Sequence, residues 1–518
     1  MGSRKDNSAP ATAAQSKRIT KNSLVLFSRI LVITAVNLYA VRLVLSGLGS
    51  EDYGVFNTVV GVVMTCSCVF PVLAVSVQRF FSYTMGLGDE ARLREIFSAS
   101  INIIIVSLAV LVVLFETVGV YVTGEKLQIP ADRLPQAILI FHFAILTFAF
   151  SYMQIPYTAA VFSHEDMNVY ALISCIDCVL KFIVAWLIGR TPIDGLVFYG
   201  AGLSAVTLIT LLCYVFIARC RYAECHYMMV KDHRIYRELL SFSGWTMYGA
   251  FAGIGMIQGN IILLNLFFGP LANAAFGVAN NIYNSFTSLT NSVVLAFRPR
   301  MIQQYAARQY DNLMHLFTLN NKFILYLLSC ASIPVVLEMP AIMRLWLGGN
   351  VSADMILFSR LFIVYTVILA MHNPITIIMQ ATGRIKVYHL VTETVMLGSM
   401  PLTWLLFTMG MPSFAVFVSM ISLCLVAHFA RVLCLKRNLD IVSLSQYAVQ
   451  ILLRGVCVLG LSAAAAWCVH RAIDGSMVRL CVVMLFSPCA TFAVTYLVGL
   501  RREERAAVNA IVKKIIKR

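Results

Sequence analysis

Residues 195–218, GLVFYGAGLSAVTLITLLCYVFIA, form a long apolar stretch that contains no charged residue. A helix needs about 20 mainly apolar residues to cross the hydrocarbon core of a bilayer. Stretches of this kind recur from Asn22 almost to Leu500, separated by short polar segments. The 518 residues are 60% hydrophobic and 12% charged, whereas soluble domains are typically about 45–50% apolar. The membrane is therefore the solvent for most of the chain.

The apolar stretches predict an all-α, polytopic membrane protein. Unpaired backbone groups are too costly in hydrocarbon, and the stretches are too long and continuous for the strands of a barrel. We expect about fourteen transmembrane helices of about 20 residues or more each. The expected spans are 22–45, 55–84, 96–121, 135–157, 166–189, 195–218, 239–268, 272–297, 318–338, 355–380, 385–408, 412–434, 446–470 and 477–499.

The basic residues are distributed unevenly between the connecting segments. With a cytoplasmic N-terminus, the connectors on the cytoplasmic side hold most of the 40 lysines and arginines, including those in 219–237, 298–308 and 431–437. The opposite connectors carry few bases and several acids. This asymmetry follows the positive-inside rule, and it predicts a bacterial inner-membrane protein with both termini in the cytoplasm. Contact with anionic lipids accounts for the net charge of +16 without nucleic acid.

Two regions about 220 residues apart resemble each other, which indicates an internal duplication. Residues 54–57, GVFN, are similar to 277–280, GVAN, and the connectors that begin at Arg79 and Arg300 lead into the next apolar run with similar leucine and phenylalanine positions. Six predicted helices separate the copies, so the halves share an orientation and should be related by a pseudo-two-fold axis along the membrane normal. Chance similarity between apolar stretches is the alternative.

This duplication predicts two six-helix lobes followed by two extra helices. The predicted parts are a cytoplasmic N-terminal tail (1–21), an N-lobe with helices 1 to 6 (22–218), a basic cytoplasmic linker (219–238), a C-lobe with helices 7 to 12 (239–434), two extra helices (446–499) and a basic amphipathic cytoplasmic tail (500–518).

Few charged side chains lie inside the predicted spans, where each costs about 2.5–3.5 kcal/mol at the centre of a helix on insertion scales. Such residues usually face a cavity or a transport pathway. Bases outnumber acids among them, which favours an anionic substrate, and guanidinium groups match phosphate oxygens in a bidentate geometry. We therefore predict that Arg29, Lys181 and Arg360 bind a phosphate-bearing substrate. The full set is Arg29, Asp177, Lys181, Lys322, Arg360, Glu393 and Arg454.

Each of these charges also has a structural interpretation. Asp177 and Lys181 lie four residues apart on one helical face and could simply neutralise each other. Lys322 and Arg454 lie near helix ends on the cytoplasmic side, from which their charged groups could extend to the membrane surface. Arg29 and Arg360 could serve only as hydrogen-bond donors to neighbouring helices.

Amide side chains and one proline complete the candidate site. Asn37, Asn280 and Asn284 could bind sugar hydroxyls in a wet cavity, or could form hydrogen bonds between helices, as polar residues commonly do in membranes. Pro374 should interrupt its helix, because proline lacks a backbone donor, and this predicts either a gate or a passive kink.

The residue patterns of enzymes and metal sites are not found. No Gly-Lys-Ser nucleotide-binding loop occurs, the connectors hold no cluster of acids, histidines or serines suited to catalysis, and the closely spaced cysteine pairs lack a second ligand pair. We expect no enzymatic activity, no metal and no cofactor.

Several stretches resemble the lipid-linked oligosaccharide flippases of bacterial surface polysaccharide synthesis. They are Tyr39–Leu45 (YAVRLVL), Gly49–Phe56 (GSEDYGVF), Arg79–Phe81 (RFF), Leu345–Gly348 (LWLG) and Gln380–Lys386 (QATGRIK). This family belongs with the multidrug and toxin extrusion (MATE) transporters in one exporter superfamily. The resemblance implies a two-lobed core of about twelve helices with two added helices that moves an undecaprenyl-pyrophosphate-linked oligosaccharide by alternating access.

The resemblance also implies a role for one residue and a set of partners. Members of this family are thought to meet the pyrophosphate with cationic cavity residues that include a first-helix arginine, and Arg29 occupies a comparable location. The expected partners are the lipid-linked oligosaccharide, anionic inner-membrane lipids and the polysaccharide polymerase or ligase machinery, with the chain itself a monomer. The alternative is a MATE-like cation-coupled multidrug exporter, which would use Asp177 and Glu393 for ion coupling; the first helix, however, has no acid.

Overall fold

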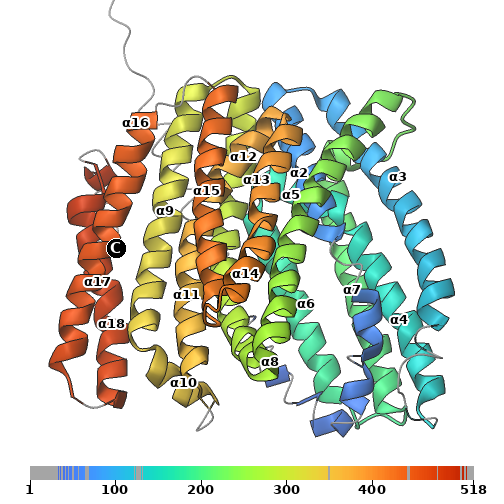
Figure 1. Cartoon of the computed structure of the whole chain (residues 1–518). Helices are drawn as coiled ribbons and strands as arrows, with labels where there is room; N and C mark the ends of the chain where they lie inside the picture. The colour runs from blue at the N-terminus through green and yellow to red at the C-terminus, as the bar shows by residue number, and fades with distance from the viewer. Residues whose placement is uncertain are drawn as a thin grey trace, which may run out of the picture. The chain divides into compact units, whose positions relative to one another are not determined.

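The computed structural model describes residues 33, 36, 39–40, 43–44, 46–49, 52–56, 58–64, 69–121, 123, 130, 132–347, 351–439, 444–474, 476–501, 504–506 and 509. Every regular element in this part of the chain is helical (Figure 1), so the predicted all-α fold is confirmed. Within it, 11 helices are long and apolar enough to cross a membrane, or 12 if the bent pair Asp52–Met64 and Val69–Leu87 is one span. The chain is therefore a multi-pass membrane protein, in agreement with the predicted number of about fourteen spans.

These helices correspond to predicted spans with shifted ends. They are Glu90–Gly119, Leu134–Ser163, Met167–Leu187, Gly195–Arg221, His233–Gly269, Tyr310–Leu337, Ala353–Thr382, Ile385–Thr408, Ala415–Asn438, Ala448–Ala472 and Met477–Gly499.

Two further predicted spans have other outcomes. The span 22–45 lies mostly outside the described residues. The span 272–297 is helical, as the second half of α8 (His233–Ala306), but its polar residues make it less hydrophobic than the other spans. α8 is broken at Gly269, whose φ of 77° and ψ of −169° are open to glycine and strained for other residues. The predicted separation of two helices at this point is confirmed.

The chain divides into two compact units, which are described separately. The N-terminal unit comprises Thr20–Met247, and the other unit contains Tyr248–Arg518, called here the C-terminal unit. The division falls within the first half of α8.

The helices of the N-terminal unit pack around an aromatic and aliphatic core. Phe141 and Phe148 of α4 are fully buried, and Phe148 packs against Phe115 with ring centroids 5.3 Å apart. α4 lies along α7, and α2 packs against α5. The helices are α2 (Val69–Leu87), α3 (Glu90–Leu114, continued by a π-helical turn at Phe115–Gly119), α4 (Leu134–Met153), α5 (Ile155–Ser163), α6 (Met167–Leu187) and α7 (Gly195–Arg221).

Asp194 fixes the start of α7. Its Oδ1 accepts hydrogen bonds from the backbone N–H groups of Leu196 (3.0 Å) and Val197 (3.2 Å), which satisfies donors that the first helical turn leaves free. Its Oδ2 pairs with Arg133 at 2.9 Å, and Arg133 also contacts Asp52 at 2.9 Å. The hydrogen bond to Asp194 and the charge of Asp52 raise the pKa of the Arg133 guanidinium above its ordinary value. This network joins the starts of α4 and α7.

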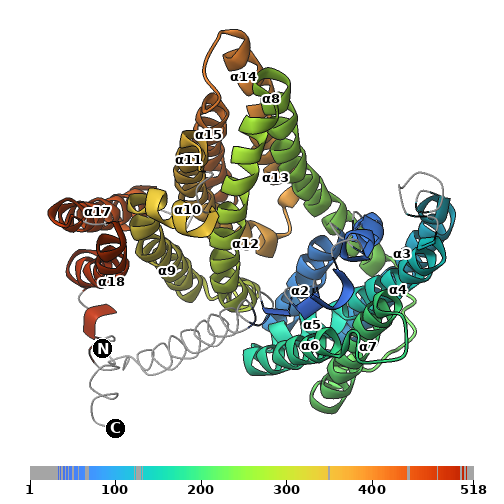
Figure 2. The same ribbon diagram turned by 90° about the horizontal axis from the view of Figure 1, so that it is seen from below.

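The C-terminal unit has its own aromatic core. Phe276 of α8 lies 5.0 Å from Phe362 and 5.6 Å from Phe417 between ring centroids, and all three are fully buried. α11 and α15 therefore pack side by side, as Figure 2 shows. Besides α8, the helices are α9 (Tyr310–Leu337), α10 (Met339–Leu347), α11 (Ala353–Ala370), α12 (His372–Thr382), α13 (Ile385–Leu397), α14 (Ser399–Thr408), α15 (Ala415–Asn438), α16 (Leu444–Tyr447), α17 (Arg454–Ala472) and α18 (Ser476–Val494).

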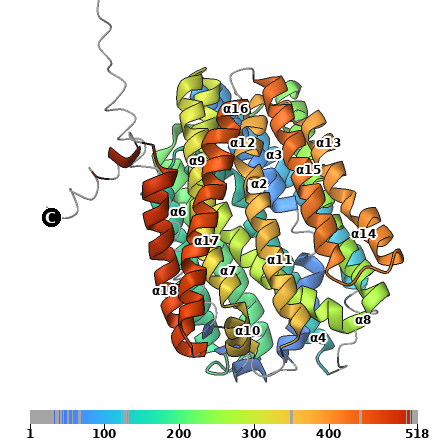
Figure 3. The same ribbon diagram turned by 60° about the vertical axis from the view of Figure 1, so that its left-hand side comes forward.

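The two extra helices, α17 and α18, pack against each other and against α9 (Figure 3). Near the middle of α9, Lys322 is buried and its ammonium group lies 2.8 Å from both carboxylate oxygens of Glu504. The interpretation that Lys322 extends to the surface is therefore wrong, because an acid from the chain's end neutralises it inside the unit. The remainder of the predicted tail 500–518 lies largely outside the described residues.

Candidate functional site

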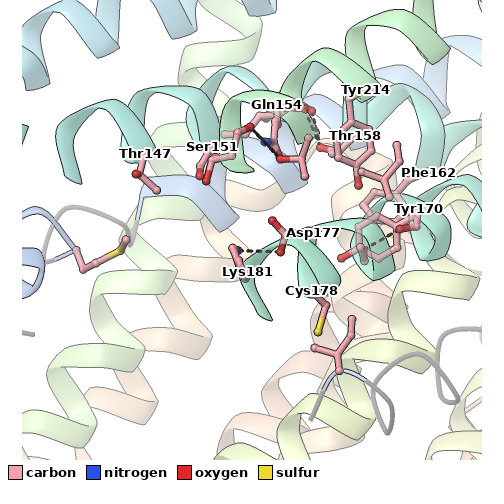
Figure 4. Close-up of a pocket in the computed structure, with 17 residues that line it drawn as sticks. Thr147, Ser151, Gln154, Thr158, Phe162, Tyr170, Asp177, Cys178, Lys181 and Tyr214 are labelled. Atoms are coloured by element: carbon pink, nitrogen blue, oxygen red, sulfur yellow. Dashed lines mark hydrogen bonds and ion pairs between the residues drawn. The ribbon is translucent and has the colours of Figure 1, made fainter. Parts of the chain in front are cut away.

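A pocket with a volume of about 510 Å³ lies within the N-terminal unit. Its walls come mainly from α4, α5, α6 and α7, with Ile33 and Met64 from earlier in the chain, and they combine hydroxyl and amide groups with apolar side chains. Figure 4 shows Asp177 and Lys181 of α6 facing Ser151, Gln154 and Thr158 across this pocket. Asp177 and Lys181 are the predicted site residues that line it among the described residues.

Asp177 and Lys181 form an ion pair, with Lys181 Nζ 2.8 Å from Asp177 Oδ2. The pair arises from their spacing, since residues four apart lie on the same face of a helix. The structure thus bears out the neutralising contact without removing either residue from the pocket. An ammonium group has three donors, so Lys181 can still donate two hydrogen bonds to a ligand. These are the only charged side chains in the described lining, whose formal charges therefore sum to zero.

Several side chains of the uncharged lining can accept hydrogen bonds. Thr158, Ser174 and Thr207 donate their hydroxyl protons to backbone carbonyls of the preceding turn, at 2.7–3.1 Å. A hydroxyl has one proton and two lone pairs, so each oxygen can still accept a hydrogen bond. Gln154 uses its Nε2 in hydrogen bonds to Thr207 O (3.2 Å) and Thr210 Oγ1 (3.0 Å). The pocket therefore suits a ligand with several hydroxyl or amide donors.

The break between α4 and α5 positions Gln154 in the wall of the pocket. Pro156 occupies the first turn of α5, where its missing backbone donor is tolerated but continuation of the preceding helix is not. Gln154 stands at the break, and its side chain is held by α7 instead of by its own helix.

Arg29 and Asn37, two of the other predicted binding residues, lie outside the described residues. The remaining three are described and do not line this pocket. Arg360 of α11 donates from Nε to the backbone carbonyl of Val336 at 2.9 Å, within the C-terminal unit. Asn280 and Asn284 lie on α8 in that same unit; Asn284 is exposed, and the buried Oδ1 of Asn280 has no hydrogen-bond partner among the described residues.

A second buried polar group lies in the C-terminal unit and surrounds Glu393. Arg431 Nη2 donates to Glu393 Oε1 at 2.6 Å, and Arg431 Nε donates to Tyr388 Oη at 3.1 Å. Arg431 Nη1 lies 2.9 Å from His372 Nδ1. His389 lies one turn before Glu393 on α13, with its Nδ1 3.7 Å from Glu393 Oε1. We call these five residues the Arg431 cluster.

Arg431, counted above among the bases of the cytoplasmic connectors, lies inside the C-terminal unit. Only 4% of Arg431 is exposed, and it lies on α15 about two turns before the helix ends at Asn438. Glu393 was singled out from the sequence, but Arg431, His372 and His389 were not. The sequence signal that could have found them is the presence of two histidines and an arginine among apolar residues of the predicted spans.

Pro374 lies in the first turn of α12. α11 ends at Ala370 and α12 begins at His372, so the helix is interrupted directly before the proline. Whether the interruption acts as a gate stays a prediction. Among the described residues, no group of three or more histidine, cysteine, aspartate or glutamate side chains could hold a metal ion.

No protein-family model and no curated protein matches the chain. Solved structures do match. One is described as an outward-facing multidrug resistance MATE family transporter of the MOP superfamily, with a TM-score of 0.67 and 15% identity over 82% of this chain and 95% of that one. The chain has the fold of the MATE transporters. A MATE in complex with MaD3S matches with a TM-score of 0.68 and 13% identity over 82% and 96% of the two chains.

A third match to the MATE fold is a MOP superfamily transporter from Pyrococcus furiosus. Its TM-score is 0.64 at 15% identity, over 82% of this chain and 95% of that one. That structure is described by a reverse polarity of its binding pocket, which suggests a different function for it. At such identities the likeness is one of fold, and the pocket chemistry of each chain has to be read from its own residues.

Proposed function

We propose that this protein is a transporter that flips an undecaprenyl-pyrophosphate-linked oligosaccharide across the bacterial inner membrane by alternating access, for surface polysaccharide synthesis. The MATE fold supports a transport function, and the uneven distribution of basic residues supports a topology with both termini in the cytoplasm. The observation that carries the choice of substrate is the composition of the pocket in the N-terminal unit.

That pocket suits a glycan better than a lipophilic cation. Its acid, Asp177, is already paired with Lys181, so the described lining residues include no unpaired carboxylate that could bind a cation. Its hydroxyl and amide oxygens accept hydrogen bonds from a sugar, whose hydroxyls can donate and accept. Lys181 keeps two donors for an anionic oxygen. In this proposal Lys181 and Arg29 meet the pyrophosphate, and the walls around Gln154 and Thr158 meet the sugar.

The predicted roles of the C-terminal residues form part of the same proposal. Arg360 uses its Nε in a backbone hydrogen bond, and its terminal amino groups are the atoms it would offer to a phosphate. Asn280 and Asn284 would contact sugar as the substrate passes the C-terminal unit. Ion coupling at Asp177 would first require the ion pair with Lys181 to open.

Complementation of a flippase-deficient bacterium tests the proposal. Loss of one charge-assisted hydrogen bond costs about 1.5–3 kcal/mol, which corresponds to about a 10- to 100-fold loss of substrate affinity. We therefore expect Lys181→Ala to reduce polysaccharide export strongly and Lys181→Arg to retain part of it. Lys231→Ala, which removes an exposed lysine outside the pocket, is the matched control and should export normally.

The same strains separate flipping from the MATE-like exporter alternative, which the fold fits equally. A cation-coupled multidrug exporter would lower the accumulation of cationic dyes and leave the flippase defect uncorrected. Normal export by both Lys181 variants would remove Lys181 from substrate binding, and resistance to dyes without export would overturn the flippase proposal.

A further inference from the structure

Two arginines lie where the extra helices meet α9, and neither guanidinium has a hydrogen-bond or ion-pair partner among the described residues. Arg454 begins α17, and Arg501 lies two residues after the last turn of the α18 segment, which ends at Gly499. Both side chains are half-buried. The proposed transport pathway gives neither of them a role.

Close packing brings the two arginines to one place on α9. Gly455, next to Arg454, lies so close to α9 that a Cβ atom there would collide with Leu325. Tyr326 Oη donates a hydrogen bond to the backbone carbonyl of Gly499 at 3.1 Å. The start of α17 and the end of the α18 segment therefore contact consecutive residues of α9.

The one described acid at this place is already paired. Both carboxylate oxygens of Glu504 lie 2.8 Å from Lys322 Nζ, and Oε2 also accepts from the backbone N–H of Arg501 at 2.7 Å. Arg454 and Arg501 lie close enough to Lys322 for their charges to act on its ammonium group. Since Lys322 and Glu504 neutralise each other, the two guanidinium charges are left without a counter-ion among the described residues.

A third arginine, Arg505, is engaged in a different way. Its Nε donates to the backbone carbonyl of Leu500 at 3.2 Å, and its Nη2 donates to that of Leu497. These carbonyls lie at the end of the α18 segment, where helical partners run out. Arg454 and Arg501 make no such contacts, so their donors remain available. A guanidinium offers five donors in a planar fork that matches the oxygens of a phosphate.

Apolar side chains surround the two arginines on the outer surface of the unit. Leu453 and Val456 flank Arg454 on α17, Leu497 lies in the last turn of the α18 segment, and all three are exposed. Exposed side chains of this kind on membrane helices face lipid acyl chains, which are as apolar as leucine. A free anion would gain nothing from such a surface. A lipid with an anionic headgroup would fit both the charges and the apolar flanks.

The backbone of both extra helices changes at this same place. A π-helical segment, Ala448–Leu453, directly precedes Arg454, and another, Thr495–Gly499, ends two residues before Arg501. π-Helical turns are rare and are found frequently at functional sites. This observation is independent of the charges, and it marks the same two positions.

We propose that Arg454 and Arg501 bind the phosphate of an anionic phospholipid, whose acyl chains lie along Leu453, Val456 and Leu497. Basic groups between membrane helices bind anionic headgroups in this way. A zwitterionic phospholipid carries its own cation and cannot neutralise the two arginines. In the topology predicted from the basic connectors, the lipid belongs to the cytoplasmic leaflet. The proposal needs a membrane around the C-terminal unit and does not depend on the transported substrate.

Native mass spectrometry of the full chain tests the lipid site. The protein is released from detergent that contains equal amounts of phosphatidylglycerol and phosphatidylcholine, and the wild type should retain phosphatidylglycerol preferentially. Arg454→Gln and Arg501→Gln should each weaken its binding about tenfold, the effect of losing one charge-assisted hydrogen bond. Arg437→Gln, which removes an exposed base in the last turn of α15, is the matched control and should bind normally. Equal retention of the two lipids by the wild type overturns the proposal.

Thermal unfolding in detergent gives a second readout. A ligand that binds only the folded protein raises its unfolding temperature. Phosphatidylglycerol should therefore stabilise the wild type and Arg437→Gln more than the double variant Arg454→Gln with Arg501→Gln. Without added lipid the double variant should unfold as the wild type does, because neither side chain contacts another described residue. Equal stabilisation of the double variant and the wild type contradicts the site.

Three other ligands distinguish the source of the phosphate. Inorganic phosphate and pyrophosphate, at the concentration of phosphatidylglycerol that stabilises the wild type, should leave the unfolding temperature unchanged. Equal stabilisation by either ion would indicate a site for soluble anions and would overturn the lipid assignment. Undecaprenyl phosphate should not displace phosphatidylglycerol when added in equal amount. Its preferential retention by the wild type, lost in the double variant, would assign the arginines to the polyprenyl lipid instead.

Discussion

Glu338 Oε1 lies 2.6 Å from His470 Nδ1, which joins the end of α9 to the end of α17 within the C-terminal unit. Arg479 of α18 reaches the same carboxylate, with its Nε 3.1 Å from Oε1 and 3.3 Å from Oε2. Glu338 is completely buried, whereas both partners are partly exposed. A single acid thus contacts both extra helices.

Removal of this acid should loosen α17 and α18. Glu338→Gln leaves Arg479 without its counter-ion, and we expect a loss of about 1–3 kcal/mol of stability, the cost of a disrupted buried polar contact. Thermal unfolding of the protein in detergent measures the loss. Arg471→Gln, which removes a nearby base that does not contact Glu338, is the control. Equal stability of Glu338→Gln and the wild type would show that apolar packing alone holds the extra helices.

His164 and Glu224 give a pH dependence whose sign can be worked out. His164 Nε2 lies 2.5 Å from Glu224 Oε1, and the His164 ring stacks on Tyr222 with centroids 4.1 Å apart. Burial raises the pKa of Glu224, but the hydrogen bond from His164, a backbone hydrogen bond and the charge of His164 outweigh it, so the pKa lies below the ordinary value of 4.5. A lowered folded-state pKa means stability that is present above pH 4.5 and is lost as the pH falls through the folded pKa.

The expected outcome is a stability difference between the wild type and Glu224→Gln that shrinks on acidification. Above pH 4.5 the wild type should be the more stable, and the two melting curves should converge as Glu224 takes up its proton. Glu238→Gln is the control, because the pair of Glu238 with Arg92 is exposed and should contribute little at any pH. A difference that grows on acidification would contradict the assigned sign.

The fold could be predicted from the sequence because each membrane span is a run of consecutive apolar residues. The stretch 195–218 needs no partner to be recognised as a helix, and the break at Gly269 coincides with a gap between two apolar runs. The pairing of Asp177 with Lys181 is also local, since it follows from four-residue spacing.

The Arg431 cluster could not be predicted in the same way. Its contacts join residues 38 and 59 positions apart, on three helices, and no spacing rule reports such contacts. Hydropathy also gave the wrong expectation for Arg431. A base near the end of an apolar run is expected at the membrane surface, whereas Arg431 is buried. The pocket could not be predicted for the same reason. Its hydroxyl groups come from four helices, and within each helix they look like ordinary polar residues.

Asp194 should stabilise the N-terminal unit in two separable ways. Asp194→Asn keeps an oxygen for the backbone donors of α7 but removes the charge that pairs with Arg133, so a loss of about 0.2–1 kcal/mol is expected for this partly exposed pair. Asp194→Ala also removes the cap, which costs about 0.5–2 kcal/mol more. Unfolding in denaturant measures both. With Arg133→Gln as background, Asp194→Asn should cost less; an unchanged cost would show that the ion pair contributes nothing.

Two glycines of α8 provide a matched pair for the space around His389. A Cβ atom added at Gly249 would lie 2.8 Å from His389 Nδ1 and 3.2 Å from its Cε1, whereas one added at Gly253 would meet nothing within 4 Å. Gly253→Ala should therefore stabilise the helix by about 0.5–1 kcal/mol, the ordinary gain of alanine over glycine. Gly249→Ala should instead destabilise by about 1–3 kcal/mol, because the buried imidazole has to shift. Thermal unfolding of the two variants side by side measures the contrast. If both gain stability equally, His389 has free space around it, and the close packing of α8 against α13 described here is wrong.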